Sequence, residues 1–262
     1  MNILDQLAAH AHERVTADMQ RIPLEEMKQL ARKSKPERSG SFAAALRKPG
    51  LSFICEVKRA SPSKGLIAPD FPYIKIAREY ETAGADCISC LTEPKWFLGS
   101  DDIFRDIRAA VSVPMIRKDF TVSEYQIYQA KVMAADAVLL ICSILNPEAL
   151  GKYLALCGEL GMDALTEAHT EEEISMAVRA GAKIIGVNNR NLKNFSVDFS
   201  NAARLRDRIP SDCIYVAESG VSGPEDAAAL RRIGADAVLI GETLMRSENK
   251  FETLQKLREA AL

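Results

Sequence analysis

The sequence predicts an α/β protein, a closed (β/α)8 or TIM barrel preceded by a helical N-terminal extension. A short motif recurs four times: a small residue, then Ala, usually Asp, and then an apolar β-prone run. Its first positions, Gly84, Ala134, Gly181 and Gly234, are 50, 47 and 53 residues apart. Each interval fits two βα units, and a further apolar run lies midway in each. Amphipathic helical stretches separate these runs.

Counted in order, the apolar runs give eight predicted strands. They are Phe53–Lys58, Cys87–Leu91, Val113–Lys118, Ala137–Ile141, Asp163–Glu167, Lys183–Asn188, Ile214–Glu218 and Ala237–Ile240. Strands that alternate with helices indicate a parallel sheet, and eight uninterrupted units favour a closed barrel. The main alternative is a doubly wound open sheet. Such a sheet normally carries a GxGxxG turn after its first strand, whereas this turn reads RASPSKG.

The first 48 residues contain no strand candidate and read as helices. One apolar helix face is formed by Leu4, Leu7, Ala8, Ala11 and Val15. Pro23 favours the start of a second helix, and SFAAALRK gives a short third one. We expect residues 1–48 to pack on a barrel of residues 53–262 within one domain, 1–262. A sharper alternative is a lid over one end of the barrel.

The overall composition favours a cytoplasmic protein. The 34 basic and 36 acidic residues give a net charge of −2, which argues against nucleic acid as the main partner. No apolar run approaches the ~20 residues that span a bilayer, so no membrane association is expected. The N-terminus is too polar for a secretory signal, and six cysteines without an export signal read as reduced thiols.

Metal and nucleotide sites are not indicated. His10 and His12 lie in the first helix, and His169 ends no predicted strand, which argues against a His-based metal site. Cys87 and Cys90 form a CxxC motif, but on one strand they face opposite sides. There is no P-loop and no dinucleotide fingerprint. We therefore expect neither a metal nor a cofactor.

Polar residues end many of the predicted strands, where barrel enzymes carry their catalytic groups. These residues are Glu56, Lys58, Lys118, Glu167, Asn188, Glu218 and Ser219. Strand alternation turns Glu56 and Lys58 to the same side as Ile54. Lysines and glutamates that converge on one mouth suit general acid–base catalysis. Crowding and partial burial would both lower the pKa of such lysines.

The last two strands are followed by candidate phosphate loops, AESGVSGPED and IGETLM. Gly220 and Gly241 let backbone N–H groups approach a ligand, and a short helix near Glu242 would point its N-terminus there. Ser219 and Arg190 could add polar contacts. A phosphorylated small molecule is therefore the expected partner.

Together these residues closely resemble the indole-3-glycerol phosphate synthase family of tryptophan biosynthesis. The motifs that carry the resemblance are EVKRASPSKG (56–65), LTEPKWFLGS (91–100), PMIRKDF (114–120), LTEAHTEEE (165–173), GVNNRNL (186–192), VAESGV (216–221) and LIGETLMR (239–246). They follow the family's order and, with the helical extension, take in essentially the whole chain. Departures from the family pattern are Thr166, Trp96 and Ala134.

The resemblance implies a cofactor-independent carboxy-lyase. The family converts 1-(2-carboxyphenylamino)-1-deoxyribulose 5-phosphate to indole-3-glycerol phosphate, carbon dioxide and water. By resemblance, Lys118 is the general acid of ring closure. Lys58 and Glu167 serve the dehydration, while Glu56 and Asn188 position lysines and substrate.

The resemblance also implies the binding residues. Ser61, Ser219, Gly220, Arg190, Gly241 and Glu242 match substrate or phosphate positions. The anthranilate pocket matches Phe97, Phe120, Leu192 and Leu239. The chain carries one barrel, so we expect a monofunctional enzyme without a fused isomerase.

Two other functions remain open from the residues themselves. A Schiff-base aldolase would use a strand-end lysine as a nucleophile. A catalytically silent phosphosugar-binding protein would use only the phosphate loops, although it would have no need of paired acids and bases.

Overall fold

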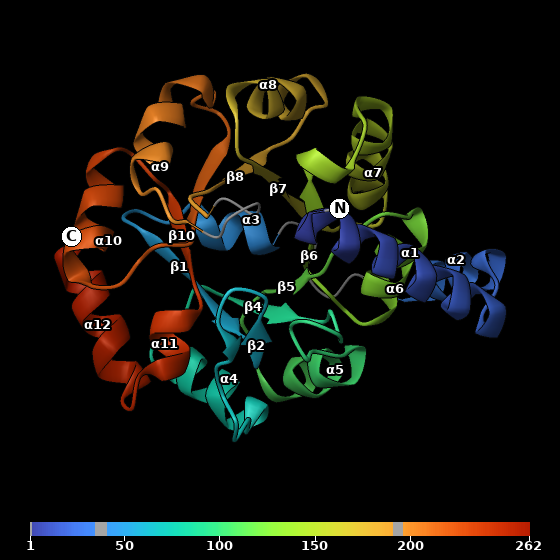
Figure 1. Ribbon diagram of the computed structural model, residues 1–262, viewed down its shortest axis with the longest axis horizontal. Coiled ribbons are helices and arrows are strands. Elements are labelled where there is room, and N and C mark those ends of the chain that lie inside the picture. Colours follow the sequence, from blue (N-terminus) through green and yellow to red (C-terminus); the bar gives the residue numbers. More distant parts are fainter. Residues whose placement is uncertain (1, 35–40, 191–195) are drawn as a thin grey trace.

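Eight parallel strands form a closed barrel in the computed structural model, which describes residues 2–34, 41–190 and 196–262 (Figure 1). They are β1 (Ser52–Val57), β4 (Cys87–Leu91), β5 (Met115–Lys118), β6 (Ala137–Ile141), β7 (Asp163–Ala168), β8 (Ile184–Asn188), β9 (Ile214–Glu218) and β10 (Ala237–Ile240). Strand β1 pairs with both β4 and β10, which closes the ring. The predicted barrel is confirmed, with strand boundaries within two residues of those expected, and the open sheet is excluded.

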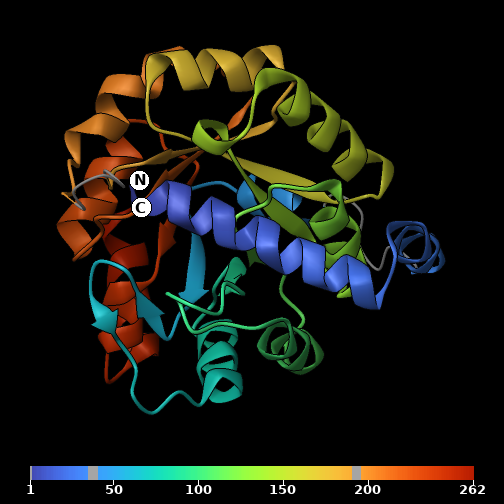
Figure 2. The same ribbon diagram turned by 45° about the vertical axis from the view of Figure 1, so that its right-hand side comes forward.

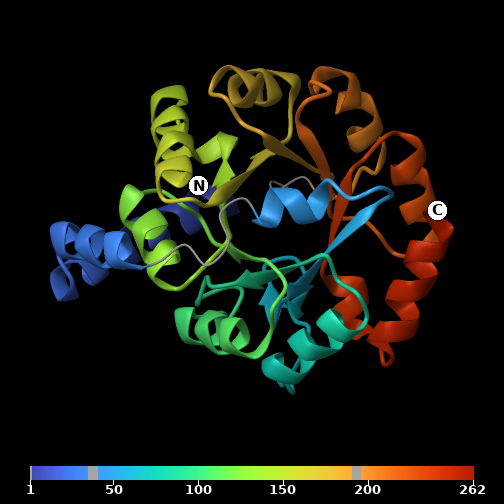
Figure 3. The same cartoon turned by 180° about the vertical axis from the view of Figure 1, so that it is seen from behind.

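Helices surround the barrel as an outer layer, seen from behind in Figure 3. They are α4 (Tyr73–Thr82), α5 (Asp101–Ala110), α6 (Glu124–Val132), α7 (Pro147–Glu159), α8 (Glu171–Arg179), α9 (Ser200–Leu205), α10 (Pro224–Arg232) and α12 (Lys250–Ala260). Shorter turns are η1 (Cys142–Ile144), η2 (Arg206–Arg208) and α11 (Glu242–Arg246). Ser100, Asn146 and Thr170 each accept a backbone N–H at a helix start, which satisfies a donor that the helix cannot.

The fourfold motif of the sequence marks a repeated helix end. Gly84, Ala134, Gly181 and Gly234 all have positive φ, between 58° and 89°. At each end the next residue's N–H reaches back five residues, as from Ala135 to the Ala130 carbonyl at 3.0 Å. This is the hydrogen bonding of a Schellman motif, which needs a left-handed residue. Glycine adopts that conformation without cost, but Ala134 does not.

The aspartate of the motif ties neighbouring strands together. Asp86, Asp136 and Asp236 accept the backbone N–H groups of Phe53, Met115 and Tyr215, at 2.9, 2.8 and 2.7 Å. Each aspartate lies directly before one barrel strand. The residue whose N–H it accepts lies at or near the start of the preceding barrel strand. The recurrence of Asp in the motif is therefore structural.

The core has two layers, separated by strand alternation. Side chains such as Ile54, Leu139 and Val216 fill the barrel interior. The opposite faces pack against the outer helices. Cys87 belongs to the inner layer and Cys90 to the outer one, which confirms that the CxxC pair is split by the sheet. All six cysteines are buried free thiols.

The N-terminal extension covers both ends of the barrel. It contains α1 (Ile3–Arg21), α2 (Leu24–Lys33) and α3 (Ser41–Leu46). The long α1 helix crosses the mouth (Figure 2), whereas α3 lies across the opposite end (Figure 3). There the Ala43 N–H donates to Asp163 Oδ2 at 2.9 Å, and Phe42 joins the inner core. The sequence predicted an extension that packs on the barrel or forms a lid over one end, and in the structure it covers both ends.

The segment after β1 forms a small antiparallel hairpin that the sequence did not predict. It pairs β2 (Ala60–Ser61) with β3 (Gly65–Leu66). The hairpin folds the SPSKG loop over the rim of the mouth. Across the described ranges, no helix combines the length and the apolar character that a membrane crossing requires.

Candidate active site

A cavity of about 870 Å³ opens at the carboxyl ends of the strands. Every predicted site residue other than Leu192 lines it, and Leu192 lies outside the described residues. The lining includes Glu56, Lys58, Ser61, Phe97, Lys118, Phe120, Glu167, Asn188, Arg190, Ser219, Gly220, Leu239, Gly241 and Glu242. Barrel closure therefore brings together residues that the sequence spreads over almost 190 positions.

Lys118, at the end of β5, lies at the centre of a buried charge cluster. Its Nζ is 3.4 Å from Glu167 Oε2 and 3.5 Å from Glu218 Oε2, on β7 and β9. Burial alone would lower the pKa of Lys118. The carboxylates of Glu218, Glu167 and Glu56 outweigh it and raise the pKa above its usual value. The expectation of a lowered lysine pKa was wrong for Lys118, because it counted neighbouring lysines and not three neighbouring carboxylates.

The two carboxylates beside Lys118 have opposite pKa shifts. Burial raises the pKa of Glu218 to about 8, because Lys118 offsets only part of it and Glu167 and Glu56 repel its charge. Burial acts on Glu167 as well, but Lys118, His169 and a hydrogen bond from Asn188 outweigh it and lower its pKa. One carboxylate is therefore charged near neutral pH while the other carries a proton, a division typical of acid–base pairs.

Glu218 is the residue that sequence reasoning left out of the catalytic set. Its position at the end of a predicted strand is the feature of the sequence that could have identified it as a candidate catalytic residue. Its carboxylate occupies the space where a Cβ on Gly186 of β8 would lie. Its Oε1 is buried and has no hydrogen-bond partner among the described residues. The sequence shows the residue but not this contact across the barrel.

Glu56 and Lys58 form a second ion pair at the rim of β1. Lys58 Nζ donates to Glu56 Oε1 at 2.5 Å, which confirms that strand alternation turns them to the same side. A Cβ on Gly241, after β10, would overlap Glu56 Oε1 and lie 2.9 Å from Lys58 Nζ. A glycine at this position is therefore needed for the pair to reach the mouth.

The loops after β9 and β10 offer backbone donors. Ser219 and Gly220 have φ of 67° and 95°, two successive left-handed residues in the turn after β9. Consecutive N–H groups in such turns form concave anion sites. Glu242 begins α11, and its side chain pairs with Lys64 at 3.4 Å and Arg246 at 3.1 Å. At the start of α11, the backbone N–H of Glu242 can therefore contact an anion, whereas its carboxylate is paired with Lys64 and Arg246.

An apolar wall lies in the same cavity as the charged cluster. The rings of Phe97 and Phe120 lie 6.1 Å apart at 40°, and Leu239 lines the same space. Ile3 and Leu7 of α1 also line the cavity, a contribution that the sequence did not predict. A cavity with one apolar and one polar half suits an aromatic ligand that also carries charges.

Helix α1 is tied to the two loops that carry this wall. His10 Nδ1 lies 3.1 Å from Glu93 Oε1, and Glu93 accepts the backbone N–H groups of Trp96 and Phe97. One turn further on, Arg14 donates to both oxygens of Asp119, at 2.6 and 3.1 Å. Asp119 lies between Lys118 and Phe120 in the chain. Helix α1 therefore contacts the loops after β4 and β5 through two buried carboxylates, those of Glu93 and Asp119.

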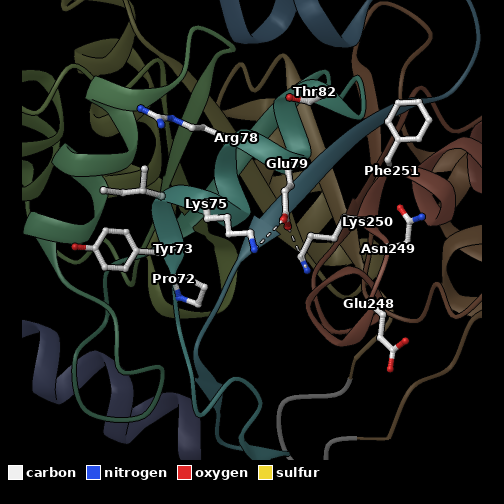
Figure 4. Close-up of a pocket in the computed structure, with 11 residues that line it drawn as sticks. Pro72, Tyr73, Lys75, Arg78, Glu79, Thr82, Glu248, Asn249, Lys250 and Phe251 are labelled. Carbon is white, nitrogen blue, oxygen red and sulfur yellow. Dashed lines mark ion pairs between the residues drawn. The ribbon is translucent and has the colours of Figure 1, made fainter.

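A second hollow of about 690 Å³ lies outside the barrel, between α4 and the start of α12 (Figure 4). Glu79 pairs there with Lys75 at 3.9 Å and Lys250 at 3.6 Å. No strand end contributes to its lining. The acid–base residues therefore face the mouth of the barrel and not this groove.

Comparisons with known proteins agree with this geometry. The family model described as indole-3-glycerol phosphate synthase matches residues 4–257. The indole-3-glycerol phosphate synthase of Ruminiclostridium cellulolyticum is 50% identical over 259 residues, which cover 99% of this chain and 100% of that protein. That of Endomicrobium trichonymphae is 48% identical over 257 residues, with 98% and 100% covered.

A solved structure shares the fold at much lower identity. Thiamine phosphate pyrophosphorylase from Pyrococcus furiosus superposes with a TM-score of 0.62 at 15% identity, covering 80% of this chain and 95% of that one. This likeness concerns the barrel alone. Because the family model and these relatives extend over nearly the full chain, the chain belongs to the indole-3-glycerol phosphate synthase family.

Proposed function

We propose that the mouth residues carry out the family's reaction by lysine and glutamate acid–base catalysis. The substrate would be 1-(2-carboxyphenylamino)-1-deoxyribulose 5-phosphate, and the products indole-3-glycerol phosphate, carbon dioxide and water. The observation that carries this proposal is the buried cluster of Lys118, Glu167 and Glu218 at the strand ends. The cluster lines a cavity that also contains apolar side chains and the loops after β9 and β10.

Lys118 is proposed as the general acid of ring closure. As the aromatic carbon attacks the C2 carbonyl, the carbonyl oxygen gains negative charge and needs a proton. An ammonium group with a raised pKa is present in the acid form across the neutral range, which supports this role. Loss of carbon dioxide then returns its bonding electrons to the ring.

The dehydration is proposed to use a second acid and a base. Glu167, with its lowered pKa, is charged and suits the base. Lys58, held by Glu56 at 2.5 Å, would give its proton to the departing hydroxyl, which leaves as water. Glu218, with its pKa near 8, could hold the proton in transit between Lys118 and Glu167. Asn188 would position Glu167.

The two ends of the substrate are proposed to bind in the two halves of the cavity. The phosphate would meet the backbone N–H groups of Gly220 and Gly241, with Ser61, Ser219 and Arg190 as side-chain partners. The aromatic ring would lie against Phe97 and Phe120, with Leu239 beside them. Leu192 remains a predicted wall residue. The reaction requires no electron or group carrier, so no cofactor enters the proposal.

The raised pKa of Lys118 argues against the Schiff-base aldolase. An amine must lose its proton before it attacks a carbonyl, and lysines of that type have depressed pKa values. Neutralising Lys118 would also leave the neighbouring carboxylates uncompensated. A silent binding protein would gain nothing from this buried charge cluster.

A direct assay with the carboxyphenylamino-deoxyribulose phosphate tests the proposal, because the indole product is fluorescent. Substitution Lys118→Ala should lower kcat by about a hundredfold or more, in the range for loss of a general acid. Lys183→Ala is the matched control, since this exposed lysine lies just before β8 at the far end of the barrel. A large rise in KM with nearly unchanged kcat would reduce Lys118 to a binding residue.

A further inference from the structure

His169 directly follows β7, because this strand extends one residue beyond its predicted end to Ala168. Its ring lies between two carboxylates. Nε2 is 3.5 Å from Glu167 Oε1, and Nδ1 is 3.4 Å from Glu173 Oε2. Glu173, in the first turn of α8, also accepts the backbone N–H of His169 at 2.6 Å. The ring therefore sits behind Glu167, held by α8 and outside the lining of the cavity.

The protonation state follows from these two contacts. A neutral imidazole has one N–H and one lone pair, so either tautomer would turn a lone pair toward a carboxylate. The imidazolium presents an N–H on both sides. The buried Nε2 makes no hydrogen bond within the described structure, and the carboxylate that lies beside it, at 3.5 Å, is that of Glu167. Burial lowers the pKa of His169, but Glu173, Glu167 and Glu218 outweigh it and raise the pKa.

The contacts of Glu167 and Glu218 differ. Lys118 faces Oε2 of both, at 3.4 and 3.5 Å. The second oxygen of Glu167 faces His169, whereas the second oxygen of Glu218 is buried and has no hydrogen-bond partner within the part of the chain that the structure describes. The shared lysine cannot distinguish the two carboxylates at such similar distances. Two groups do distinguish them: the imidazole of His169, and Asn188, which donates a hydrogen bond to Glu167 and not to Glu218.

We propose that His169 is a positioning residue that, held as an imidazolium by Glu173, directs the single proton of the carboxylate pair to Glu218 and keeps Glu167 ionised as the base. The proposal rests on the proposed role of Glu167 in the reaction. His169 acts through Glu167 and does not touch the substrate. Among the described residues no group of His, Cys, Asp and Glu has the arrangement of a metal site, so the ring is not accounted for as a ligand.

The charged and titratable groups around the pair come from several elements. Glu167 faces Lys118 of β5 and Glu218 of β9, with the charge of Glu56 on β1 further away. His169 faces Glu173 of α8, and Cys142 of η1 lies beside Glu173, with its Sγ 3.6 Å from the Glu173 backbone carbonyl. Burial raises the pKa of that thiol to about 12, so it stays neutral.

The first test compares the pH dependence of kcat for the wild type, His169→Asn and Glu173→Gln. Without the imidazolium, the pKa of Glu167 should rise, so the acid limb should move up by roughly one pH unit. Below that limb His169→Asn should lose roughly tenfold in kcat relative to the wild type. His12→Asn is the matched control, because His12 is exposed on α1. A uniform loss at every pH, or an unmoved limb, would overturn the proposal.

The second test reads the imidazole itself and needs no turnover. The chain has three histidines, so ring ¹⁵N signals are few, and His169 is identified by its absence from His169→Asn. The His169 ring should stay protonated above pH 6.5, the ordinary pKa of a histidine, and Glu173→Gln should move its titration down. A ring already neutral at pH 6 would refute the proposal. Wild-type product formation separately reports whether the proposed function holds.

Discussion

Among single residues, Gly186 shows how the absence of a side chain shapes the site. It lies on β8 beside Glu167 of β7, and the position of its missing Cβ is occupied by the carboxylate of Glu218. The atom nearest to that Cβ position is Oε1 of the Glu218 carboxylate. A methyl group at this position would therefore move Glu218 away from Lys118.

We predict that Gly186→Ala lowers kcat by roughly tenfold or more, since displacements of about 1 Å in a catalytic group have effects of this order. Folding should be largely retained, because the strand conformation suits alanine. Gly158→Ala is the control, as Gly158 lies in α7 with open space at its Cβ position. Steady-state kinetics check both. An unchanged kcat for Gly186→Ala would show that Glu218 has no part in the reaction.

That the strand-end residues line the mouth of the barrel could be predicted from the sequence, but their ionisation could not. Strand alternation and strand ends suffice to select Glu56, Lys58, Lys118 and Glu167. The pKa directions depend on which side chains meet across the barrel. The contact between Lys118 and Glu218 joins positions 100 residues apart. Nothing in the local pattern of either strand reports that distance.

On the scale of elements, the helix ends of the repeated motif form a natural comparison. Gly84, Gly181 and Gly234 occupy the same left-handed position as Ala134, whose φ is 58°. An alanine side chain in this region costs roughly 1–2 kcal/mol. The motif was predictable because this conformation selects glycine, and the exception is a point of local strain.

We predict that Ala134→Gly stabilises the protein by about 0.5–1 kcal/mol. The substitution relieves the backbone strain of Ala134, and the greater conformational freedom of glycine in the unfolded chain offsets part of that gain. The reverse change, Gly84→Ala, should destabilise by a similar amount. A Cβ there would meet no neighbouring atom, so only the backbone conformation is tested. Urea unfolding measures both. Changes of the same sign in the two variants would contradict this explanation.

Helix α1 supplies the second prediction at this scale. Arg14 is the guanidinium that meets both oxygens of Asp119, which is only 2% exposed. Arg14→Ala should cost about 1.5–3 kcal/mol of stability, the usual loss for a hydrogen bond to a charged group. It should also lower kcat, because Asp119 adjoins Lys118.

Arg21→Ala is the matched control for Arg14→Ala. Arg21 lies on the same helix, but its ion pair with Asp18 is 76% exposed on the arginine side. Exposed pairs contribute 0–1 kcal/mol at most. Equal losses of stability in the two variants, measured by urea unfolding, would mean that the Asp119 contact does not hold α1.

The strands and most helices were predictable because their patterns are local. The β2–β3 hairpin was not, since two-residue strands such as Ala60–Ser61 leave no periodicity to detect. The paths of α1 and α3 were also hidden. An amphipathic face indicates that a helix packs, but not which end of a barrel it meets.

For the whole molecule, the buried carboxylate of Glu218 links stability to pH. Its pKa is about 8 in the folded protein, against 4.5 for an ordinary glutamate. Between these values the folded protein keeps a proton that the unfolded chain releases. The stabilising contribution of Glu218 is therefore complete below pH 4.5 and declines as the pH rises to 8.

We predict that Glu218→Gln, which cannot titrate, is more stable than the wild type at pH 8 by about 1–3 kcal/mol. At pH 4.5 the two proteins should differ little. Urea unfolding at both pH values gives the comparison, and kinetics on the same samples should show that the gain in stability accompanies a loss of activity. A difference independent of pH would place the pKa of Glu218 near its ordinary value.

The closed barrel was predictable as a whole, because the even spacing of the motif leaves room for eight units. Because eight consecutive βα units favour a closed barrel, the pairing of the first barrel strand, β1, with the last, β10, follows from the number of units. The coverage of both ends by the extension could not be anticipated. It depends on contacts such as that between Ala43 and Asp163, which join segments 120 residues apart.

The pairing of β1 with β10 has a consequence for synthesis on the ribosome. The extension and β1 emerge before the other barrel strands, yet β1 pairs with Ala237–Ile240. At translation rates of roughly 5–20 residues per second, the nascent β1 edge waits on the order of ten seconds or more for β10. During that interval its apolar edge is an unpaired strand, open to association with other chains. Helix α3, which needs β7, can begin to shield the bottom of the sheet only once Asp163 has emerged.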